Sequence, residues 1–341
     1  MYEGEAGGGH PMLEKTTFTC TASDGLAVRG MYWHDSAVEA KAAVLFIHGM
    51  LEYYGRYDAY ASFLAGKGIR FFAFDLRGHG LTTPDEAERG FFGAKNGVDR
   101  LMEDVAAVRT QMNDLLAGDG LSGLPVFLYG HSMGSFIASC YAKRTKAAGL
   151  SGILLSGTTA GNRKAGLGVV LARTQCLFLG PKSKGKFLQN MGFAGNNSRI
   201  KPARTIDDWL SRDDRIVDAY MSDPGCTFTF KAAGMADLAA LTKESGGRNW
   251  TGVVPKDVPV FIFSGEDDPV GEYGRGPKIL KNWYEETGHE TVLKLYPSGR
   301  HEMHNEINRE EVYNDVLSFI LLHSKRETPL KGALASGPGV L

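Results

Sequence analysis

Gly130-His131-Ser132-Met133-Gly134 is the segment of this 341-residue chain with the clearest catalytic potential. It follows the apolar run 126–130 and opens the amphipathic stretch 133–146. A Gly-x-Ser-x-Gly pentapeptide between a buried strand and a helix is typical of a strained turn that exposes a serine hydroxyl. Gly130 and Gly134 have a steric reason, because Cβ atoms on both sides of so sharp a turn would collide. We therefore predict Ser132 as a nucleophile, at a helix N-terminus that stabilises developing negative charge.

A serine nucleophile needs a general base and a third group that orients this base. In this strand-turn-helix context, the acid follows the serine in the chain and the histidine comes last. The apolar run 291–297 leads into His301, which we expect to take the proton of Ser132 through one ring nitrogen.

The acid is expected directly after the apolar run 258–265, where the chain reads Glu266-Asp267-Asp268-Pro269. Asp268 is our choice to hold the second ring nitrogen of His301, because Gly-x-x-Asp before a turn proline is the usual arrangement. The sequence alone does not separate it from Asp267, and Glu266 ranks third.

Two backbone N–H groups are needed to stabilise the oxyanion of an acyl-transfer intermediate. One comes from the residue after the nucleophile, Met133, and the other from the loop after an early strand, where Met50 follows His48-Gly49. We interpret His48 and Glu52 as structural groups of this loop. His301 and His304 are three residues apart, which does not match the i, i+4 spacing of the HExxH zinc motif, so no metal site is expected.

Six short apolar runs alternate with amphipathic stretches along most of the chain, which predicts an α/β protein with a mostly parallel sheet and helices on both faces. The segments 16–22 and 26–33 flank Ser23-Asp24-Gly25, a hairpin signal that predicts an antiparallel edge. The expected strand runs are 43–49, 71–76, 126–130, 152–157, 258–265 and 291–297. The expected helices are 55–67, 98–117, 133–146, 274–286 and 309–324, and the last should start with a capping box formed by Asn308 and Glu311.

The alternation stops between Ser156 and about Val258, which indicates an inserted helical cap with helices at 166–180 and 205–222. We expect a core of residues 15–157 and 251–325, a cap of residues 158–250, and a poorly ordered tail of residues 326–341.

Composition excludes several classes of protein. The 38 Lys and Arg residues nearly balance 39 Asp and Glu residues, for a net charge of −1, so no nucleic-acid partner is expected. A chain that is 43% hydrophobic is not disordered. Its 4 cysteines are too few and too widely spaced for a disulfide scaffold. Because neither an apolar leader nor a membrane-length apolar run is present, we expect a cytoplasmic protein.

Several motifs of the chain together resemble the α/β-hydrolase branch that contains monoacylglycerol lipases and bacterial lysophospholipases, also described as serine aminopeptidase-like. They are His48-Gly49-Met50-Leu51-Glu52, the segment 74–80, the pentapeptide around Ser132, Gly265-Glu266-Asp267-Asp268 and Gly299-Arg300-His301-Glu302. The resemblance covers roughly residues 15–325 and is weak in the cap. It implies an α/β-hydrolase fold with an eight-stranded sheet, a triad of Ser132, Asp268 and His301, and oxyanion donors Met50 and Met133. Because the sequence contains no glycine-rich phosphate loop or other cofactor motif in its proper context, we expect no cofactor.

The cap carries the remaining clue to the substrate. Residues 158–204 contain nine cations and no Asp or Glu, with large apolar side chains between them. Such a mixture suits contact with anionic lipid or an amphiphile, unless the cations are merely solvated while the apolar groups pack on the core. The cations are Arg163, Lys164, Arg173, Lys182, Lys184, Lys186, Arg199, Lys201 and Arg204.

We therefore expect a serine hydrolase that cleaves a single-chain lipid ester, of the monoacylglycerol or lysophospholipid type. Predicted substrate contacts are Leu51, Val169, Leu177, Phe178 and Val270.

An alcohol acceptor would make the same machinery a transacylase, and a non-catalytic binding protein is a remote alternative. An aminopeptidase or amidase is the second hypothesis, because acidic residues of the cap could bind a free amino group; these are Asp207, Asp208, Asp213, Asp214 and Asp218. Oligomeric state does not follow from the sequence.

Overall fold

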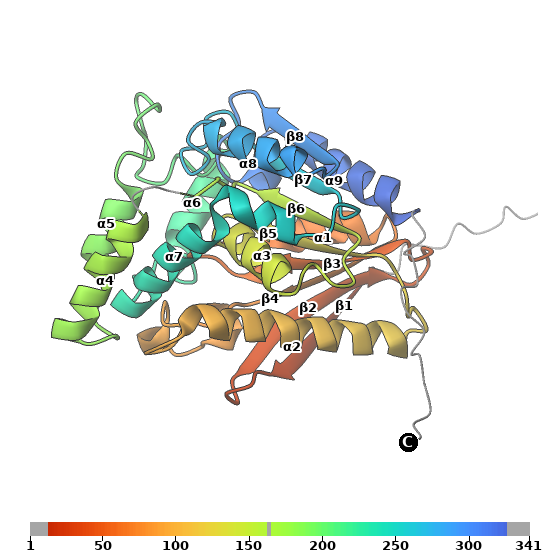
Figure 1. Ribbon diagram of the computed structural model, residues 1–341, viewed down its shortest axis with the longest axis horizontal. Helices are drawn as coiled ribbons and strands as arrows, with labels where there is room; N and C mark the ends of the chain where they lie inside the picture. The colour runs from red at the N-terminus through yellow and green to blue at the C-terminus, as the bar shows by residue number, and fades with distance from the viewer. Residues whose placement is uncertain (1–12, 162–164, 326–341) are drawn as a thin grey trace, which may run out of the picture.

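The structure, a computed structural model, describes residues 13–161 and 165–325 (Figure 1). An eight-stranded sheet runs through it in the order β1-β2-β4-β3-β5-β6-β7-β8. β2 pairs antiparallel with β1 and β4, and the remaining neighbours are parallel. This confirms the predicted hairpin and the mostly parallel sheet. The strands are β1 (Leu13–Thr21), β2 (Ala27–Asp35), β3 (Ala42–Ile47), β4 (Ile69–Phe74), β5 (Val126–His131), β6 (Gly152–Ser156), β7 (Val260–Gly265) and β8 (Thr291–Tyr296).

The central strands β3 to β7 are buried along their whole length, which explains their continuous apolar sequences. Helices α1 (Asp58–Ala65) and α9 (Arg309–Ser324) pack on one face of the sheet. Helices α2 (Gly97–Gly118), α3 (Met133–Arg144) and α8 (Arg275–Glu286) pack on the other. Short 3₁₀ helices occupy Tyr54–Tyr57, Gly80–Thr82, Glu86–Glu88, Arg248–Val253 and Met303–Asn305.

Among the described residues between β6 and β7 there are four α-helices: α4 (Ala165–Leu179), α5 (Lys186–Phe193), α6 (Asp214–Ser222) and α7 (Ala232–Ser245). In Figure 1, α4 and α5 stand at one end of the molecule, and α7 packs against both α4 and α3. We refer to this region as the cap. Its exact limits at residues 158 and 250 stay a prediction, and the expected tail at 326–341 lies outside the described residues.

The backbone before α4 meets the backbone after α7. A Cβ atom on Gly161 would lie 2.8 Å from Gly246 Cα, and one on Gly246 would lie 2.6 Å from Gly161 Cα. Such a close approach of two backbone segments requires glycine on both sides.

Two sequence predictions about helix starts are wrong. The helix expected at 205–222 begins only at Asp214, because Asp213 caps it by accepting a 3.2 Å hydrogen bond from the Arg215 N–H. Asn308 does precede α9, but its side chain donates to the Glu311 carboxylate at 3.0 Å and makes no bond to the helix backbone, so no capping box forms.

Candidate active site

Ser132 stands at the turn between β5 and α3, with φ 52° and ψ −123°. This left-handed backbone is unusual for a residue with a side chain, and a constraint from the neighbouring structure is needed to hold it. The Ser132 N–H donates to the Ser156 carbonyl at 2.9 Å, which ties the turn to β6. A Cβ on Gly130 would collide with the Gly134 carbonyl, and one on Gly134 would collide with the end of β3, as the sharp turn predicts.

His301 and Asp268 lie after neighbouring parallel strands, β8 and β7. His301 Nδ1 is 2.9 Å from Asp268 Oδ1, and both side chains are buried. The Ser264 hydroxyl donates to Asp268 Oδ2 at 2.6 Å, and the Val270 N–H donates to Oδ1 at 2.9 Å. Asp268, rather than Asp267 or Glu266, is therefore the carboxylate that contacts this histidine. Sequence reasoning missed Ser264, which no motif distinguishes from other strand serines.

The electrostatics of this pair favour ion formation. Burial disfavours the charged form of His301, but the adjacent Asp268 carboxylate outweighs burial and raises the pKa of the imidazole. Burial would likewise raise the pKa of Asp268, whereas His301, Ser264 and the Val270 N–H lower it. Asp268 is thus an anion that stabilises a proton on His301.

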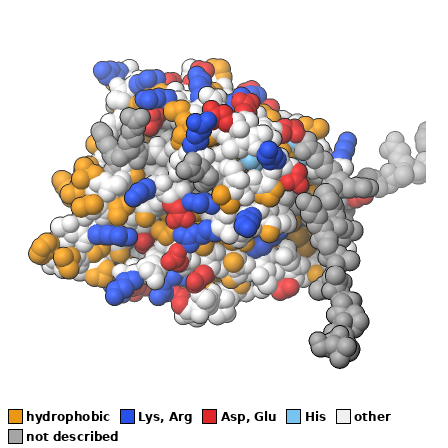
Figure 2. All heavy atoms as spheres, in the orientation of Figure 1, with side chains coloured by type: hydrophobic (Ala, Val, Ile, Leu, Met, Phe, Trp, Pro, Cys, Tyr) orange, Lys and Arg blue, Asp and Glu red, His pale blue; other side chains and the backbone are white. Residues whose placement is uncertain are grey.

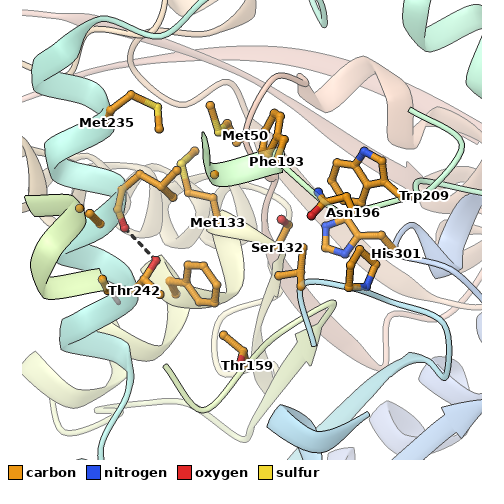
Figure 3. Close-up of a pocket in the computed structure, with 18 of the residues that line it drawn as sticks. Met50, Ser132, Met133, Thr159, Phe193, Asn196, Trp209, Met235, Thr242 and His301 are labelled. Atoms are coloured by element: carbon orange, nitrogen blue, oxygen red, sulfur yellow. Dashed lines mark hydrogen bonds between the residues drawn. The ribbon is translucent and has the colours of Figure 1, made fainter. Parts of the chain in front are cut away.

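Ser132 and His301 line the same cavity, of about 400 Å³, and in Figure 3 the serine side chain points toward the imidazole. The described residues show no hydrogen bond between the two side chains. Met50 and Met133 line the cavity beside Ser132, and the Met133 N–H belongs to the first turn of α3, where helix N–H groups have no partner within the helix. The structure thus gathers all five residues predicted for the reaction.

The loop that carries Met50 is braced by buried charges. Glu52 accepts a hydrogen bond from the Gly49 N–H and another from the Tyr57 hydroxyl at 2.8 Å. Arg56 donates to both oxygens of Glu302 at 2.7 Å and to Glu52 at 3.1 Å. Because Glu302 adjoins His301, one guanidinium connects the Met50 loop to the histidine loop.

Other histidines of the motifs have structural positions. His48 Nε2 accepts a hydrogen bond from the Leu76 N–H at 3.0 Å, and burial holds the pKa of His48 well below 6.5. His304 is buried against the rings of Tyr57 and His131, and burial lowers its pKa to about 3. Within the described residues, no group of three or more His, Cys, Asp or Glu side chains could hold a metal ion.

Only one of the five predicted substrate contacts lines the cavity. Val270 lines the cavity, whereas Leu51 is buried outside its lining and Val169 does not reach it. Leu177 and Phe178 stand at the exposed end of α4, 80% and 77% exposed. The wall that α4 contributes is formed instead by Ala165, Leu167, Gly168 and Ala172, because one helix presents only one face to the cavity.

Most of the remaining lining was not anticipated. Helix α7 contributes Met235, Leu238 and Ala239, and the loop before α6 contributes Trp209. Alanine-rich α7 has only a weak amphipathic pattern, and nothing local to Trp209 indicates a neighbour as distant in sequence as His301. Of the five acidic cap residues expected for an aminopeptidase, none lines the cavity; Asp214 and Asp218 pair with Arg204, and Asp213 pairs with Arg215.

Comparison with known proteins identifies relatives along most of the chain. The family model for serine aminopeptidase, S33, matches residues 38–308. Human monoglyceride lipase is 28% identical over 319 residues, which cover 93% of this chain and 92% of that protein. An uncharacterized abhydrolase domain-containing protein of Dictyostelium discoideum is 26% identical over 86% of this chain, and the match spans 28% of that longer protein.

Among solved structures, a thermostable carboxyl esterase from Bacillus coagulans, crystallised with glycerol, superposes with a TM-score of 0.83 and 29% identity. The match covers 91% of this chain and 99% of the esterase. These similarities confirm the α/β-hydrolase fold expected from the sequence.

Proposed function

The chain belongs to the serine aminopeptidase S33 family of α/β-hydrolases, and on this premise we propose that it hydrolyses a single-chain lipid ester through an acyl-enzyme on Ser132. The observation that carries the proposal is the position of Ser132 and the His301–Asp268 pair beside a cavity whose walls on α4 and α7 are apolar except for Thr242. A cavity of about 400 Å³ lies within the roughly 300–1,000 Å³ of ligand sites. Similarity to human monoglyceride lipase supports a monoacylglycerol as the substrate, and a lysophospholipid is the other single-chain lipid ester of the proposal.

In the first half-reaction, Ser132 Oγ attacks the ester carbonyl while His301 Nε2 takes its proton. Asp268 holds the Nδ1–H of the resulting imidazolium, and the N–H groups of Met50 and Met133 stabilise the oxyanion. When the C–O bond breaks, His301 gives the proton to the departing alcohol. Water then attacks the acyl-enzyme with the same base and releases the fatty acid; an alcohol in place of water would make the reaction a transacylation.

A matched substrate panel tests this proposal. We expect turnover of 1-monoacylglycerols or lysophospholipids, with loss of at least about 10³-fold in Ser132→Ala. Ser245→Ala, which changes a buried serine far from the catalytic loops in sequence, serves as the control and should retain activity. Turnover of aminoacyl anilides without ester turnover would favour the aminopeptidase alternative. Full lipid-ester activity in Ser132→Ala would refute the mechanism.

We also propose that the cap contacts anionic lipid. Leu177, Phe178 and Leu179 at the end of α4, with Phe187 on α5, are at least 70% exposed. The alternative that the apolar groups of the cap pack on the core therefore does not apply to these four side chains, although it does apply to Leu188. Figure 2 shows apolar side chains gathered with cations at the end of the molecule formed by α4 and α5.

The cations of this surface are Lys182 and Lys184, between α4 and α5, and Lys186, the first residue of α5, and all three are exposed. Lys182 pairs with Glu88, and no ion pair is found for Lys184 or Lys186 among the described residues. Arg163 and Lys164 lie outside the described residues. An apolar tip flanked by unpaired lysines matches the chemistry of an anionic bilayer. We propose a peripheral contact; no helix within the described ranges is long and apolar enough to cross a membrane.

Vesicle sedimentation tests this contact. Binding to phosphatidylglycerol vesicles should exceed binding to phosphatidylcholine vesicles and weaken with salt. The double variant Leu177→Ser/Phe178→Ser should lose binding, whereas Leu322→Ser, at a residue 64% exposed on α9, should not. Equal binding by both variants would contradict the assignment of the surface.

A further inference from the structure

The loop before α6 makes direct contact with the histidine loop. The His301 N–H donates to the Trp209 carbonyl at 3.3 Å, and the Glu302 N–H donates to the Leu210 carbonyl at 2.8 Å. Two successive backbone groups at the proposed base are thus bonded to the cap rather than to the core sheet. We call residues 207–212 the Trp209 segment.

Side chains from the histidine loop fix both ends of this segment. The Arg300 guanidinium donates to the Asp208 carbonyl at 2.5 Å and to the Ser211 carbonyl at 2.7 Å. Arg212 donates to the buried Glu306 carboxylate at 2.9 Å, and the same carboxylate accepts from the Arg300 N–H at 2.9 Å. The Trp209 segment is therefore held by charge-assisted hydrogen bonds on each side of the indole.

The indole itself covers the imidazole. The ring centroids of Trp209 and His301 are 5.0 Å apart, with 38° between the ring planes, and Trp209 is only 6% exposed. The ring centroid of Phe193, at the end of α5, lies 5.7 Å from that of Trp209, and the ring centroid of His131 lies 4.8 Å from that of His301. Figure 3 shows Phe193, Trp209 and His301 in succession along one wall of the cavity.

We propose that Trp209 is a positioning residue, which holds the His301 imidazole in line with Asp268 and shields it from water. The Trp209 segment would then be part of the catalytic centre, while α4 and α5 form the part of the cap that meets lipid. This inference rests on the proposed function, because it assigns a role in the same reaction.

The charged and titratable groups around His301 set what the loss of the indole should do. Asp268, Glu302 and Glu52 favour the imidazolium, burial opposes it, and His131 and His304 are neutral at pH 7 because burial lowers the pKa of each below 6.5. Removing the indole reduces burial and leaves the carboxylates in place. The pKa of His301 should therefore rise further, and a ring free to rotate should lower kcat more than it changes KM.

The experiment compares Trp209→Ala, Trp209→Phe and the control Trp283→Ala, which removes a half-buried indole on α8. For Trp209→Ala we expect kcat on a p-nitrophenyl ester to fall about 10- to 100-fold, with KM within about twofold. The acid limb of kcat/KM should move to higher pH. Trp209→Phe, which restores a ring over the imidazole, should recover most of the rate, and Trp283→Ala should leave the profile in place.

A titration of the His301 ring protons by NMR without substrate separates this inference from the proposed function. If no ester is hydrolysed by the wild-type protein, the proposed function fails, yet an upward shift of the His301 titration in Trp209→Ala still supports the contact. An unshifted titration together with an unshifted acid limb overturns the inference. A shift of equal size in Trp283→Ala overturns it as well.

Discussion

Gly157 provides the sharpest test of how tightly the imidazole is held. This glycine follows β6 with φ +56°, and a Cβ there would lie 2.8 Å from His301 Cε1 and 3.0 Å from His301 Nδ1. Ordinary contact begins at about 3.4 Å, so in Gly157→Ala the ring must retreat by roughly 0.6 Å or more. Because Nδ1 of this ring is bonded to Asp268 at 2.9 Å, the displacement of the ring should weaken that bond.

The expected magnitude has two separable parts. A left-handed backbone costs a residue with a side chain about 1 kcal/mol of folding free energy. Misplacing a catalytic group by close to 1 Å costs about 10²-fold in rate. Gly157→Ala should therefore lose roughly 30- to 100-fold in kcat/KM, and the collision should add about 1–3 kcal/mol to the backbone cost in unfolding free energy.

Gly120→Ala is the matched control. Gly120 has φ +73°, and a Cβ there meets nothing within 4 Å, so this variant carries the backbone cost without the collision. Free energies of unfolding measured in urea should fall in both variants, by more in Gly157→Ala because it adds the collision, and only Gly157→Ala should lose ester hydrolysis. A folded Gly157→Ala protein with kcat/KM within about threefold of wild type would refute the argument that His301 has no room to move.

Three further outcomes are expected. The acid limb of kcat/KM should have its midpoint above pH 6.5, since protonated His301 cannot accept the serine proton and Asp268 raises its pKa; a midpoint at or below 6.5 would contradict this. Ser264→Ala leaves a buried Asp268 oxygen without its 2.6 Å donor, so unfolding free energy should drop by about 1.5–3 kcal/mol, and a loss under about 0.5 kcal/mol would show that the bond is replaced. Burial raises the pKa of Asp237 from 3.8 to about 7, so ionising this carboxylate destabilises the fold increasingly as the pH rises between these two values. The Asp237→Asn variant should therefore have an unfolding free energy about 2 kcal/mol higher than wild type at pH 8 and an unchanged one at pH 4. An equal gain at both pH values would show that burial of the charge is not the cause.

The core sheet and the catalytic loops could be predicted because local sequence patterns determine them. The apolar runs that became β3 to β7 are long enough to cross a buried sheet, and the turn at Ser132 admits only glycine at positions 130 and 134. Chain order then placed Asp268 and His301 after adjacent strands, where the carboxyl ends of parallel strands meet.

The cap was less predictable because tertiary contacts override local preference there. The segment 205–213 has a helical pattern, yet Arg300 takes the carbonyls of Asp208 and Ser211 that a helix would need. Periodicity correctly marked 166–180 as helical but could not tell which face meets the cavity, so Leu177 and Phe178 were assigned to the wrong side.

The meeting of Gly161 and Gly246 has a consequence for how this protein could be altered. Because the two backbones touch before α4 and directly after α7, the segment between them forms a module whose ends already lie together in space. Exchanging that module for one from another hydrolase would leave β6, β7 and the His301–Asp268 pair in register, at a small cost in loop-closure entropy. Residues 207–212 would have to be retained in such a chimera, since the histidine loop is bonded to them. Substrate range could then diversify through the module while the reaction chemistry stays constant.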